Sequence, residues 1–152
     1  MRRRYMLSLV ALGVLLFVLI SAGLARVFGA NGSEQSAITA LVKAEAAGDQ
    51  PAMLARIEGC AQSAPCRTRV THNAGTLKHP GQVSIIQLQP STSFSVGGMV
   101  GTARVAWSAG SSLPIVQCVR VRRTGNVFAG LAVQLLEISV RIKSDSDCPA
   151  HY

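Results

Sequence analysis

The chain has 152 residues, of which 49% are hydrophobic, and its 15 Lys and Arg against 7 Asp and Glu give a formal net charge of +8. This hydrophobic fraction excludes an intrinsically disordered chain, and the length leaves room for one sizeable domain. Four of the basic residues are Arg2, Arg3, Arg4 and Arg26, so the rest of the chain carries eleven basic and seven acidic side chains, a net charge of +4. That modest surplus does not indicate a nucleic-acid-binding protein.

The segment Met6–Ala25 contains no charged residue. As a helix it would be ~30 Å long, which matches the hydrocarbon core of a bilayer. Three arginines precede it and only Arg26 follows closely, so the positive-inside rule predicts a cytoplasmic N-terminus and a domain outside the cytoplasm. The sequence therefore predicts a single-pass transmembrane anchor within residues 1–30 and one exported domain over residues 31–152.

A cleaved secretory signal is the alternative interpretation of the same segment. Gly23 and Ala25 are small residues at the two positions that a signal peptidase inspects, and cleavage would follow Ala25. Both alternatives deliver the domain to the same side of the membrane, where it is either held at the cell membrane or secreted. The nearby partners to consider are anionic lipid headgroups, acidic cell-wall polymers and other envelope proteins.

The four cysteines are an even number in an exported domain and predict two disulfides. Of the three possible pairings the sequence favours Cys60–Cys66 and Cys118–Cys148, because the five residues between the first two include a turn-forming proline. Zinc is the alternative use of these thiols, but no C-x-x-C or H-x-x-x-H pair occurs, and His72, His79 and His151 have no ligand spacing. We expect no metal site and no cofactor.

Helices are predicted in the first part of the exported domain. A short tether over Arg26–Gly32 leads into a helix over Ser33–Ala47, whose apolar residues recur at spacings of three and four. Asp49–Glu58 is typical of a cap followed by a shorter helix that begins with Pro51. The segment Arg67–Leu77 predicts a third helical segment.

From Gln82 onward the apolar residues alternate with a period of two, which is typical of strands. The predicted strands are Val83–Leu88, Thr102–Ser108, Pro114–Arg123 and Val127–Lys143, with hairpin turns at Ala109–Ser112 and Thr124–Asn126. In the last strand the residues expected to face the core are Leu136, Ile138, Val140 and Ile142. The pattern predicts an α+β fold: an N-terminal transmembrane helix, then a long helix plus one or two short helices packed on a curved four-stranded antiparallel sheet.

The order of these elements resembles the α+β roll shared by nuclear transport factor 2 and ketosteroid isomerase. The resemblance is carried by AITALVKAEAAGDQPAMLARI (Ala37–Ile57), where a long helix breaks at Ala-Gly-Asp before a short one, and by the strands TARVAWS and IVQCVRVRR. It rests on the order and lengths of elements, with no diagnostic motif. It implies a cone-shaped domain of the exported, single-pass type that is frequent in bacteria. Enzymes of this superfamily place a carboxylate, a tyrosine or a histidine inside the cone.

No residue of this chain is predicted to be catalytic. Glu34, Glu45 and Glu58 lie on predicted helices whose apolar faces are elsewhere, so none shows the burial that would raise its pKa toward neutrality. The two tyrosines, Tyr5 and Tyr152, lie near the two ends of the chain. An acid–base site inside a cone therefore has no candidate residue.

The strongest candidate for a binding surface is a group of arginines on the predicted sheet. Arg104, Arg120, Arg122 and Arg141 fall on strands expected to be neighbours, on the face opposite to the core. Such a basic face suits an acidic polymer, a lipid headgroup or an acidic partner protein. Outward arginines also simply keep a sheet soluble and discourage edge pairing, which is the alternative interpretation.

The sequence thus predicts a membrane-anchored, extracytoplasmic binding or assembly module of the cell envelope that is not an enzyme. The alternative is a small-molecule-binding protein or enzyme that uses the interior of the cone. An open apolar cavity of at least ~300 Å³ with converging polar groups would favour the alternative, and a filled core with the arginines gathered outside would favour the binding module.

Overall fold

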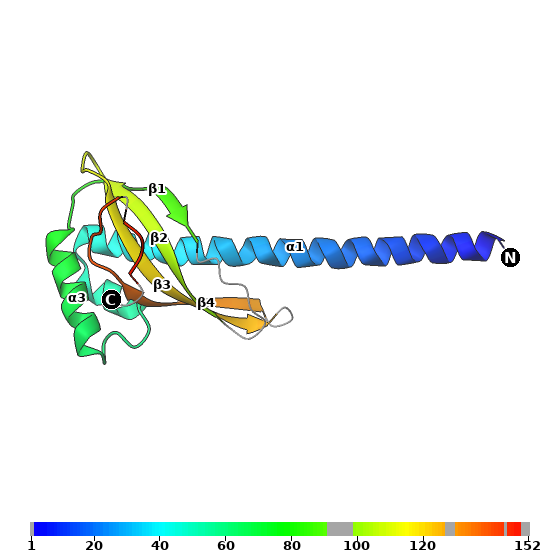
Figure 1. The fold of residues 1–152 in the computed structure, drawn as a ribbon, viewed down its shortest axis with the longest axis horizontal. Coiled ribbons are helices and arrows are strands. Elements are labelled where there is room, and N and C mark those ends of the chain that lie inside the picture. Colours follow the sequence, from blue (N-terminus) through cyan, green and yellow to red (C-terminus); the bar gives the residue numbers. More distant parts are fainter. Residues whose placement is uncertain (1, 91–98, 127–129, 145, 150–152) are drawn as a thin grey trace.

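The computed structural model describes residues 2–90, 99–126, 130–144 and 146–149 (Figure 1). Its elements in chain order are α1 (Arg2–Ala47), α2 (Gln50–Arg56), α3 (Ala64–Thr76), β1 (Val83–Gln89), β2 (Met99–Ala109), β3 (Ile115–Asn126) and β4 (Gly130–Ile138). The strands form one antiparallel sheet in the order β1-β2-β3-β4. The predicted α+β class is confirmed.

α1 is one continuous helix of 46 residues, so the prediction of a separate tether over Arg26–Gly32 is wrong. The tether contains two glycines but no proline, and a glycine costs a helix only about 1 kcal/mol. The C-terminal part of α1 packs across the sheet, whereas its N-terminal half projects from the domain as an isolated rod (Figure 1). Among the described residues, no helix combines the length and the apolarity needed to span a bilayer.

α2 and α3 begin where local capping rules place them. The side chain of Asp49 accepts a hydrogen bond from the Ala52 backbone N–H at 3.0 Å, which caps α2 as predicted. Gly48, at a φ of +70°, makes the left-handed reversal between α1 and α2. α3 begins at Ala64, three residues before its predicted start, because Pro65 fits the first turn of a helix.

The core lies between the C-terminal part of α1 and the inner face of the sheet. Its fully buried members, each with 0% of its surface exposed, include Ile38, Leu41, Val42, Met53, Val70, Ala103, Val105, Trp107, Val119 and Val121. Full burial of a large apolar side chain contributes about 1.5–3 kcal/mol. This packing fixes the sheet against the helix and so fixes which residues face outward.

The alternation predicted for the last strand is wrong because β4 contains a bulge. Arg120 pairs with Glu137, and Val121 pairs with Leu135, so Leu136 is an extra residue without a partner on β3. One extra residue shifts the alternation of every position beyond it. Leu135 is consequently buried in place of Leu136, which is only partly buried.

Beyond the bulge the strand ends early, at Ile138. Ile138 is buried as predicted, but Val140, which was expected in the core, is 44% exposed. Ser139, which the alternation placed outside, is buried at 2% exposure. Ile142, also expected in the core, is half-buried.

The turn predicted at Thr124–Asn126 is also wrong. β3 runs through these three residues, which pair with Gly130–Ala132 on β4. The connection between the two strands therefore falls at 127–129, outside the described residues. The loop predicted at Ala109–Ser112 does join β2 to β3.

Two disulfides are present, Cys60–Cys66 and Cys118–Cys148, which are the pairs that the sequence favours. None of the four cysteines is left as a free thiol. Paired cysteines in a small domain are typical of a protein that folds in an oxidising compartment outside the cytosol.

Candidate functional site

Three of the four candidate arginines share the outer face of β2 and β3. Arg104 on β2 lies opposite Cys118 on β3, two residues before Arg120, so Arg104 and Arg120 are diagonal neighbours. Diagonal positions on one face of an antiparallel pair are about 7–8 Å apart. Arg122 follows Arg120 on the same face, again two residues along β3.

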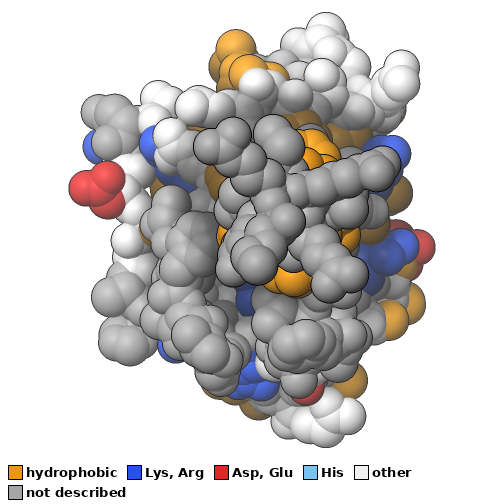
Figure 2. Space-filling model, turned by 90° about the vertical axis from the view of Figure 1, so that its right-hand side faces the viewer, with side chains coloured by type: hydrophobic (Ala, Val, Ile, Leu, Met, Phe, Trp, Pro, Cys, Tyr) orange, Lys and Arg blue, Asp and Glu red, His pale blue; other side chains and the backbone are white. Residues whose placement is uncertain are grey.

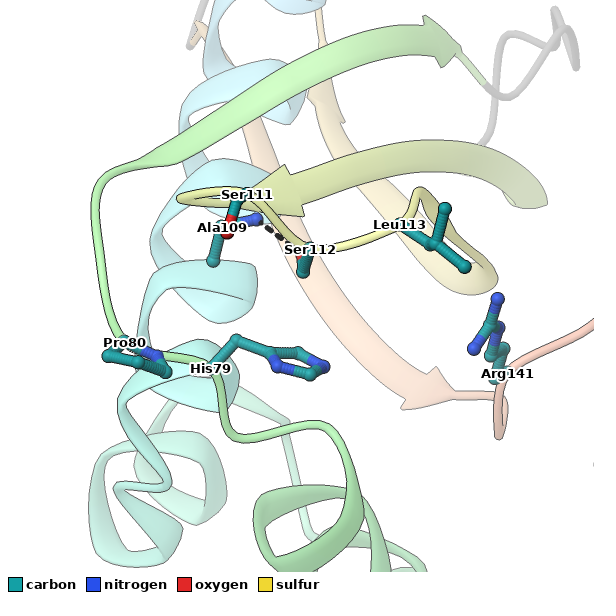
Figure 3. Close-up of a pocket in the computed structure, with 7 residues that line it drawn as sticks. All are labelled: His79, Pro80, Ala109, Ser111, Ser112, Leu113 and Arg141. Carbon is teal, nitrogen blue, oxygen red and sulfur yellow. Dashed lines mark hydrogen bonds between the residues drawn. The ribbon is translucent and has the colours of Figure 1, made fainter.

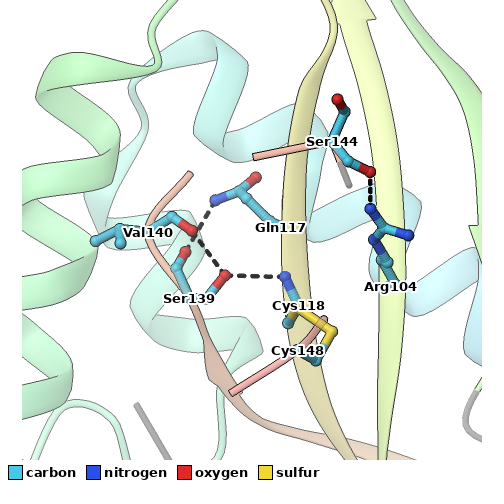
Figure 4. The surroundings of a disulfide bond; sticks show 7 residues. All are labelled: Arg104, Gln117, Cys118, Ser139, Val140, Ser144 and Cys148. Carbon is cyan, nitrogen blue, oxygen red and sulfur yellow. Dashed lines mark hydrogen bonds between the residues drawn. A yellow bond between two sulfur atoms is a disulfide. The ribbon is translucent and has the colours of Figure 1, made fainter. Parts of the chain in front are cut away.

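Two of these arginines already have protein partners. The Nη1 atom of Arg120 lies 3.7 Å from the Oε2 atom of Glu137, and both side chains are 35% exposed. The Nη2 atom of Arg104 donates a hydrogen bond to the carbonyl oxygen of Ser144 in the C-terminal segment (Figure 4). Arg122 is exposed. The outer face thus presents one readily accessible guanidinium rather than four that converge.

Arg141 lies beyond the end of β4 and is remote from Arg122. Beyond β4 the chain runs beside β3, where Ile142 pairs with Val116 in an isolated bridge. The guanidinium of Arg141 there donates to the carbonyl oxygen of Pro114 at 3.3 Å. Arg122 is six residues farther along β3 than Val116, about 20 Å away at the rise of a strand.

The C-terminal segment is fastened to the outer face of β3, as Figure 4 shows. The Cys118–Cys148 disulfide provides the covalent link. The Ser139 hydroxyl oxygen accepts a hydrogen bond from the Cys118 backbone N–H at 2.9 Å, and the same hydroxyl donates to the Val140 carbonyl oxygen at 2.7 Å. Cys118 is fully buried as a result.

A buried polar cluster between the helices and the sheet was missed by the sequence analysis. Its members, each at most 2% exposed, are Glu45, Asn73, Trp107, Gln117 and Ser139. Gln117 is the centre: its Oε1 accepts from Trp107 Nε1 at 2.8 Å, and its Nε2 donates to Glu45 Oε1 at 2.8 Å. The Ser139 carbonyl oxygen accepts from Asn73 Nδ2 at 2.9 Å and from Gln117 Nε2 at 3.1 Å. The cluster joins α1, α3, β2, β3 and the end of β4.

Burial raises the pKa of Glu45 to about 7, and hydrogen bonding with Gln117 and Asn73 lowers that pKa by less than burial raises it. The expectation that Glu45 has no context for a shifted pKa is therefore wrong. Glu45 Oε2 and Asn73 Oδ1 are buried without a hydrogen-bond partner among the described residues. A proton on the Glu45 carboxyl turns one of these acceptors into a donor, which physically favours the neutral form.

A helical spacing in the sequence could have revealed Glu45. Ile38, Leu41, Val42 and Glu45 follow one another at i, i+3, i+4 and i+7, the positions of a single helix face. Because the other three are apolar and fully buried, Glu45 enters the core with them. The alternation of β3 carries a comparable signal for Gln117, which falls on the same face of the strand as the buried Ile115, Val119 and Val121.

A second buried glutamate of α1 meets a charged partner. Glu34 is fully buried, and its Oε2 accepts a hydrogen bond from Arg123 Nε at 2.7 Å. Arg123 Nη2 contacts the same oxygen. The pair links α1 to β3 near the point where α1 leaves the domain, and it turns Arg123 away from the outward arginines.

The space between α1 and the sheet is filled by these apolar and polar side chains. Five hollows on the described residues open to solvent, and none of these five is lined by Glu45, Trp107 or Gln117. Within the described ranges, Cys, His, Asp and Glu side chains form no group of three that could hold a metal ion. The side chains of Glu45, Trp107 and Gln117 are fully buried.

Comparison with known proteins adds no assignment. No protein-family model matches the chain, and no curated protein or solved structure is significantly similar to it. The function must be argued from the geometry of this molecule.

Proposed function

We propose that the chain is a membrane-anchored, extracytoplasmic binding or assembly module of the cell envelope, in which α1 is both the anchor and a part of the domain. One observation carries the proposal: the exposed apolar rod and the buried helix face belong to a single helix. The large apolar side chains from Val10 to Ile20 are 50–72% exposed, whereas Ile38, Leu41 and Val42 on the same helix are fully buried.

The exposed part of α1 needs an apolar environment. Its apolar side chains surround the helix axis, because successive residues turn by about 100° and every residue from Val14 to Ile20 is large and apolar. Viewed along α1 from its N-terminal end, hydrophobic side chains are visible near the axis and Lys and Arg lie mostly around the periphery (Figure 2). The uncharged stretch extends in the sequence from Met6 to Ala25, and a lipid bilayer would cover it.

The charge distribution and the disulfides support an exported domain. Arg2, Arg3 and Arg4 precede the uncharged stretch, which favours a cytoplasmic N-terminus. The two disulfides favour the oxidising side of the membrane for the domain. Because α1 is continuous through Arg26–Gly32, a membrane anchor would hold the domain on a stiff stalk rather than on a flexible tether.

The side chains packed between α1 and the sheet support a binding module rather than an enzyme, because they leave no described hollow at Glu45. Gln117 bonds to both Trp107 and Glu45 in the interior, and the two hollows nearest the end of α1 are open to solvent. A second candidate, a small-molecule-binding protein or enzyme of the roll type, has one observation in its favour, which is the buried Glu45 with its pKa raised to about 7. That candidate requires the interior to open so that a substrate can reach Glu45.

Membrane extraction tests the anchor directly. The full chain is expressed in a bacterial host, and membranes are washed with alkaline carbonate. We expect the chain to stay in the pellet, and a Leu15→Arg/Leu16→Arg variant to leave it, since each arginine at the centre of a span costs about 2.5–3.5 kcal/mol. The matched control is Gln35→Arg/Ser36→Arg, which adds the same charge to exposed positions of α1 within the domain.

The intact mass of the recovered protein distinguishes the two fates of the N-terminal segment. A full-length mass in the carbonate-washed pellet supports the anchor. A loss that matches residues 1–25 would show cleavage after Ala25 and a secreted domain. Full-length protein that carbonate releases as readily as the Leu15→Arg/Leu16→Arg variant would contradict the proposal.

A further inference from the structure

A hollow of about 310 Å³ lies between the turn that follows α3 and the loop that joins β2 to β3. We call it the distal hollow, and the residues that matter for its chemistry are His79, Pro80, Ser112, Leu113 and Arg141. Figure 3 shows His79 and Arg141 on opposite sides, with Ser111 and Ser112 of the loop above His79 and Leu113 above Arg141. The distal hollow contains Arg141, the candidate arginine that lies beyond the end of β4.

The distal hollow lies at the end of the domain that is remote from the projecting half of α1 (Figure 1). The His79 backbone N–H donates to the Ala46 carbonyl oxygen at 3.0 Å, which places the hollow at the C-terminal end of α1. Ala46 is twelve residues beyond Glu34, about 18 Å farther along the helix axis. A chain anchored through α1 would therefore present this end away from the membrane.

The two walls of the distal hollow are held together by close backbone contact. Gly81 and Gly110 have φ angles of +114° and +55°, and a Cβ atom on Gly81 would lie only 2.8 Å from the Gly110 Cα atom. The Gly110 N–H donates to the Gln82 carbonyl oxygen at 3.2 Å. Since only glycine fits this approach, the sequence builds the hollow in advance of any ligand.

The lining of the distal hollow combines a basic side chain with an exposed apolar one next to it (Figure 3). Arg141 is exposed, its guanidinium carries five N–H donors, and one of its nitrogens contacts the Pro114 carbonyl oxygen. No Asp or Glu lines the hollow among the described residues. Leu113 is 77% exposed, which is the largest exposure of any large apolar side chain in the described part of the molecule.

Positive charge extends past the distal hollow along the same end of the domain. A neighbouring hollow shares His79 and Pro80 with it and is also lined by Lys43 and Lys78. Both lysines are exposed. The combined surface pairs cationic side chains with an exposed leucine, so its complement is a carboxylate next to an aliphatic side chain.

We propose that the distal hollow binds an acidic peptide segment of an envelope partner protein, with a carboxylate on Arg141 and an aliphatic side chain over the adjacent Leu113 (Figure 3). This inference rests on the proposed function as a binding module. A small inorganic anion would satisfy Arg141 but would leave Leu113 uncovered, so the peptide accounts for more of the surface. The occupant is a protein segment, because this end points away from the bilayer that α1 would enter.

The test selects random linear peptides displayed on phage against the full chain in detergent micelles. We expect the selected peptides to combine Asp or Glu with Leu, Ile or Val. Arg141→Glu should weaken their binding at least about tenfold, because it replaces a charge-assisted hydrogen bond by a repulsion. Leu113→Ser should weaken binding several-fold by removing the apolar contact.

The matched control is Arg56→Glu, which makes the same charge change at an exposed position of α2, beside the Ile57–Leu135 bridge and outside the distal hollow. This control should bind the selected peptides as the unchanged chain does. Thermal unfolding by circular dichroism shows whether Arg141→Glu remains folded, which is expected because the side-chain hydrogen bond that it loses, at 3.3 Å, is exposed.

Several outcomes would overturn the inference. Selected peptides without acidic residues, no selected peptide at all, or equal weakening by Arg141→Glu and Arg56→Glu would each do so. Inorganic phosphate that shifts the nuclear magnetic resonance signals of His79 and Arg141, when no peptide does, would make the hollow a small-anion site. If the Leu15→Arg/Leu16→Arg variant leaves the membrane but still binds the selected peptides, then the distal hollow binds them independently of the membrane anchor.

Discussion

The two buried glutamates of α1 have opposite kinds of partner, although both lie in the same helix–sheet interface. Glu34 meets the guanidinium of Arg123, and Glu45 meets the neutral amide of Gln117. Both carboxyl groups are fully buried. A buried carboxylate needs a cation or a proton, because burial penalises the charged form. At the Glu34 end the fold supplies a cation, which is the Arg123 guanidinium. At the Glu45 end burial raises the pKa of the carboxyl to about 7, so that it can hold a proton at physiological pH.

The difference assigns separate roles to the two ends of the interface. Near the projecting half of α1, the Glu34–Arg123 pair ties the helix to β3 by opposite charges. At the far end, the Glu45 cluster ties α1 to α3, to the sheet and to the residue that follows β4 through hydrogen bonds alone. We infer that the stability of the Glu34 end depends on the Glu34–Arg123 contact, and that the stability of the Glu45 end depends on pH.

The largest expected effect is the loss of the charge partner of Glu34. Arg123→Ala removes the guanidinium that contacts a fully buried carboxylate and should lower the free energy of unfolding by about 3–5 kcal/mol. Urea unfolding of the purified chain in mild detergent, followed by circular dichroism, measures the change. Arg122→Ala, the neighbouring exposed arginine, is the control and should change it by less than about 0.5 kcal/mol. A loss below about 1 kcal/mol for Arg123→Ala would mean that the pair does not support this end.

The next effect is a gain in stability at the other end. The pKa of Glu45 is about 7 in the folded chain against 4.5 as its ordinary value, so between these pH values the folded state binds more protons than the unfolded state. Stability attributable to Glu45 is therefore present below about pH 4.5 and is lost as the pH rises to about 7. Glu45→Gln removes this loss, and at pH 8 it should raise the free energy of unfolding by about 3 kcal/mol.

Urea unfolding at about pH 5 and about pH 8, on either side of the folded-state pKa, checks this prediction. The gain from Glu45→Gln should shrink strongly at the lower pH, because there the native carboxyl is already protonated. Glu58→Gln is the control, since Glu58 is exposed and the same change of charge should alter stability little at either pH. An equal effect of Glu45→Gln at both pH values would show that the carboxyl does not titrate between them.

The comparison also explains which parts of the fold the sequence could predict. Alternation along β2 correctly places Ala103, Val105 and Trp107 in the core, because these strands are regular where they face α1. The bulge at Leu136 could not be predicted from the residues of β4 alone, because it arises from the way β4 pairs with β3. At the bulge the alternation of inward and outward residues is reversed. Local patterns therefore predict a strand until a neighbouring strand imposes a different register.

The candidate site divides in the same way. Arg104, Arg120 and Arg122 reach one face because their strands pair as the sequence predicts. Arg141 is remote from Arg122, because the chain leaves the sheet after Ile138 and continues along β3 toward the β2–β3 loop. The buried cluster required the tertiary structure: Asn73 is an ordinary polar residue until the fold closes it over Glu45.

The smallest expected effect is spectroscopic, and it tests the Glu45 cluster without unfolding the chain. Trp107 is the one tryptophan, and its Nε1 donates to Gln117, which in turn donates to Glu45. Ionisation of Glu45 changes the charge two hydrogen bonds away from the indole, so the fluorescence intensity of the folded chain should titrate with a midpoint near pH 7. Glu45→Gln should abolish this step, whereas Glu34→Gln, at the other end of the interface, should leave it in place. A step that persists in Glu45→Gln would assign the titration to another group and would remove the distinction between the two ends.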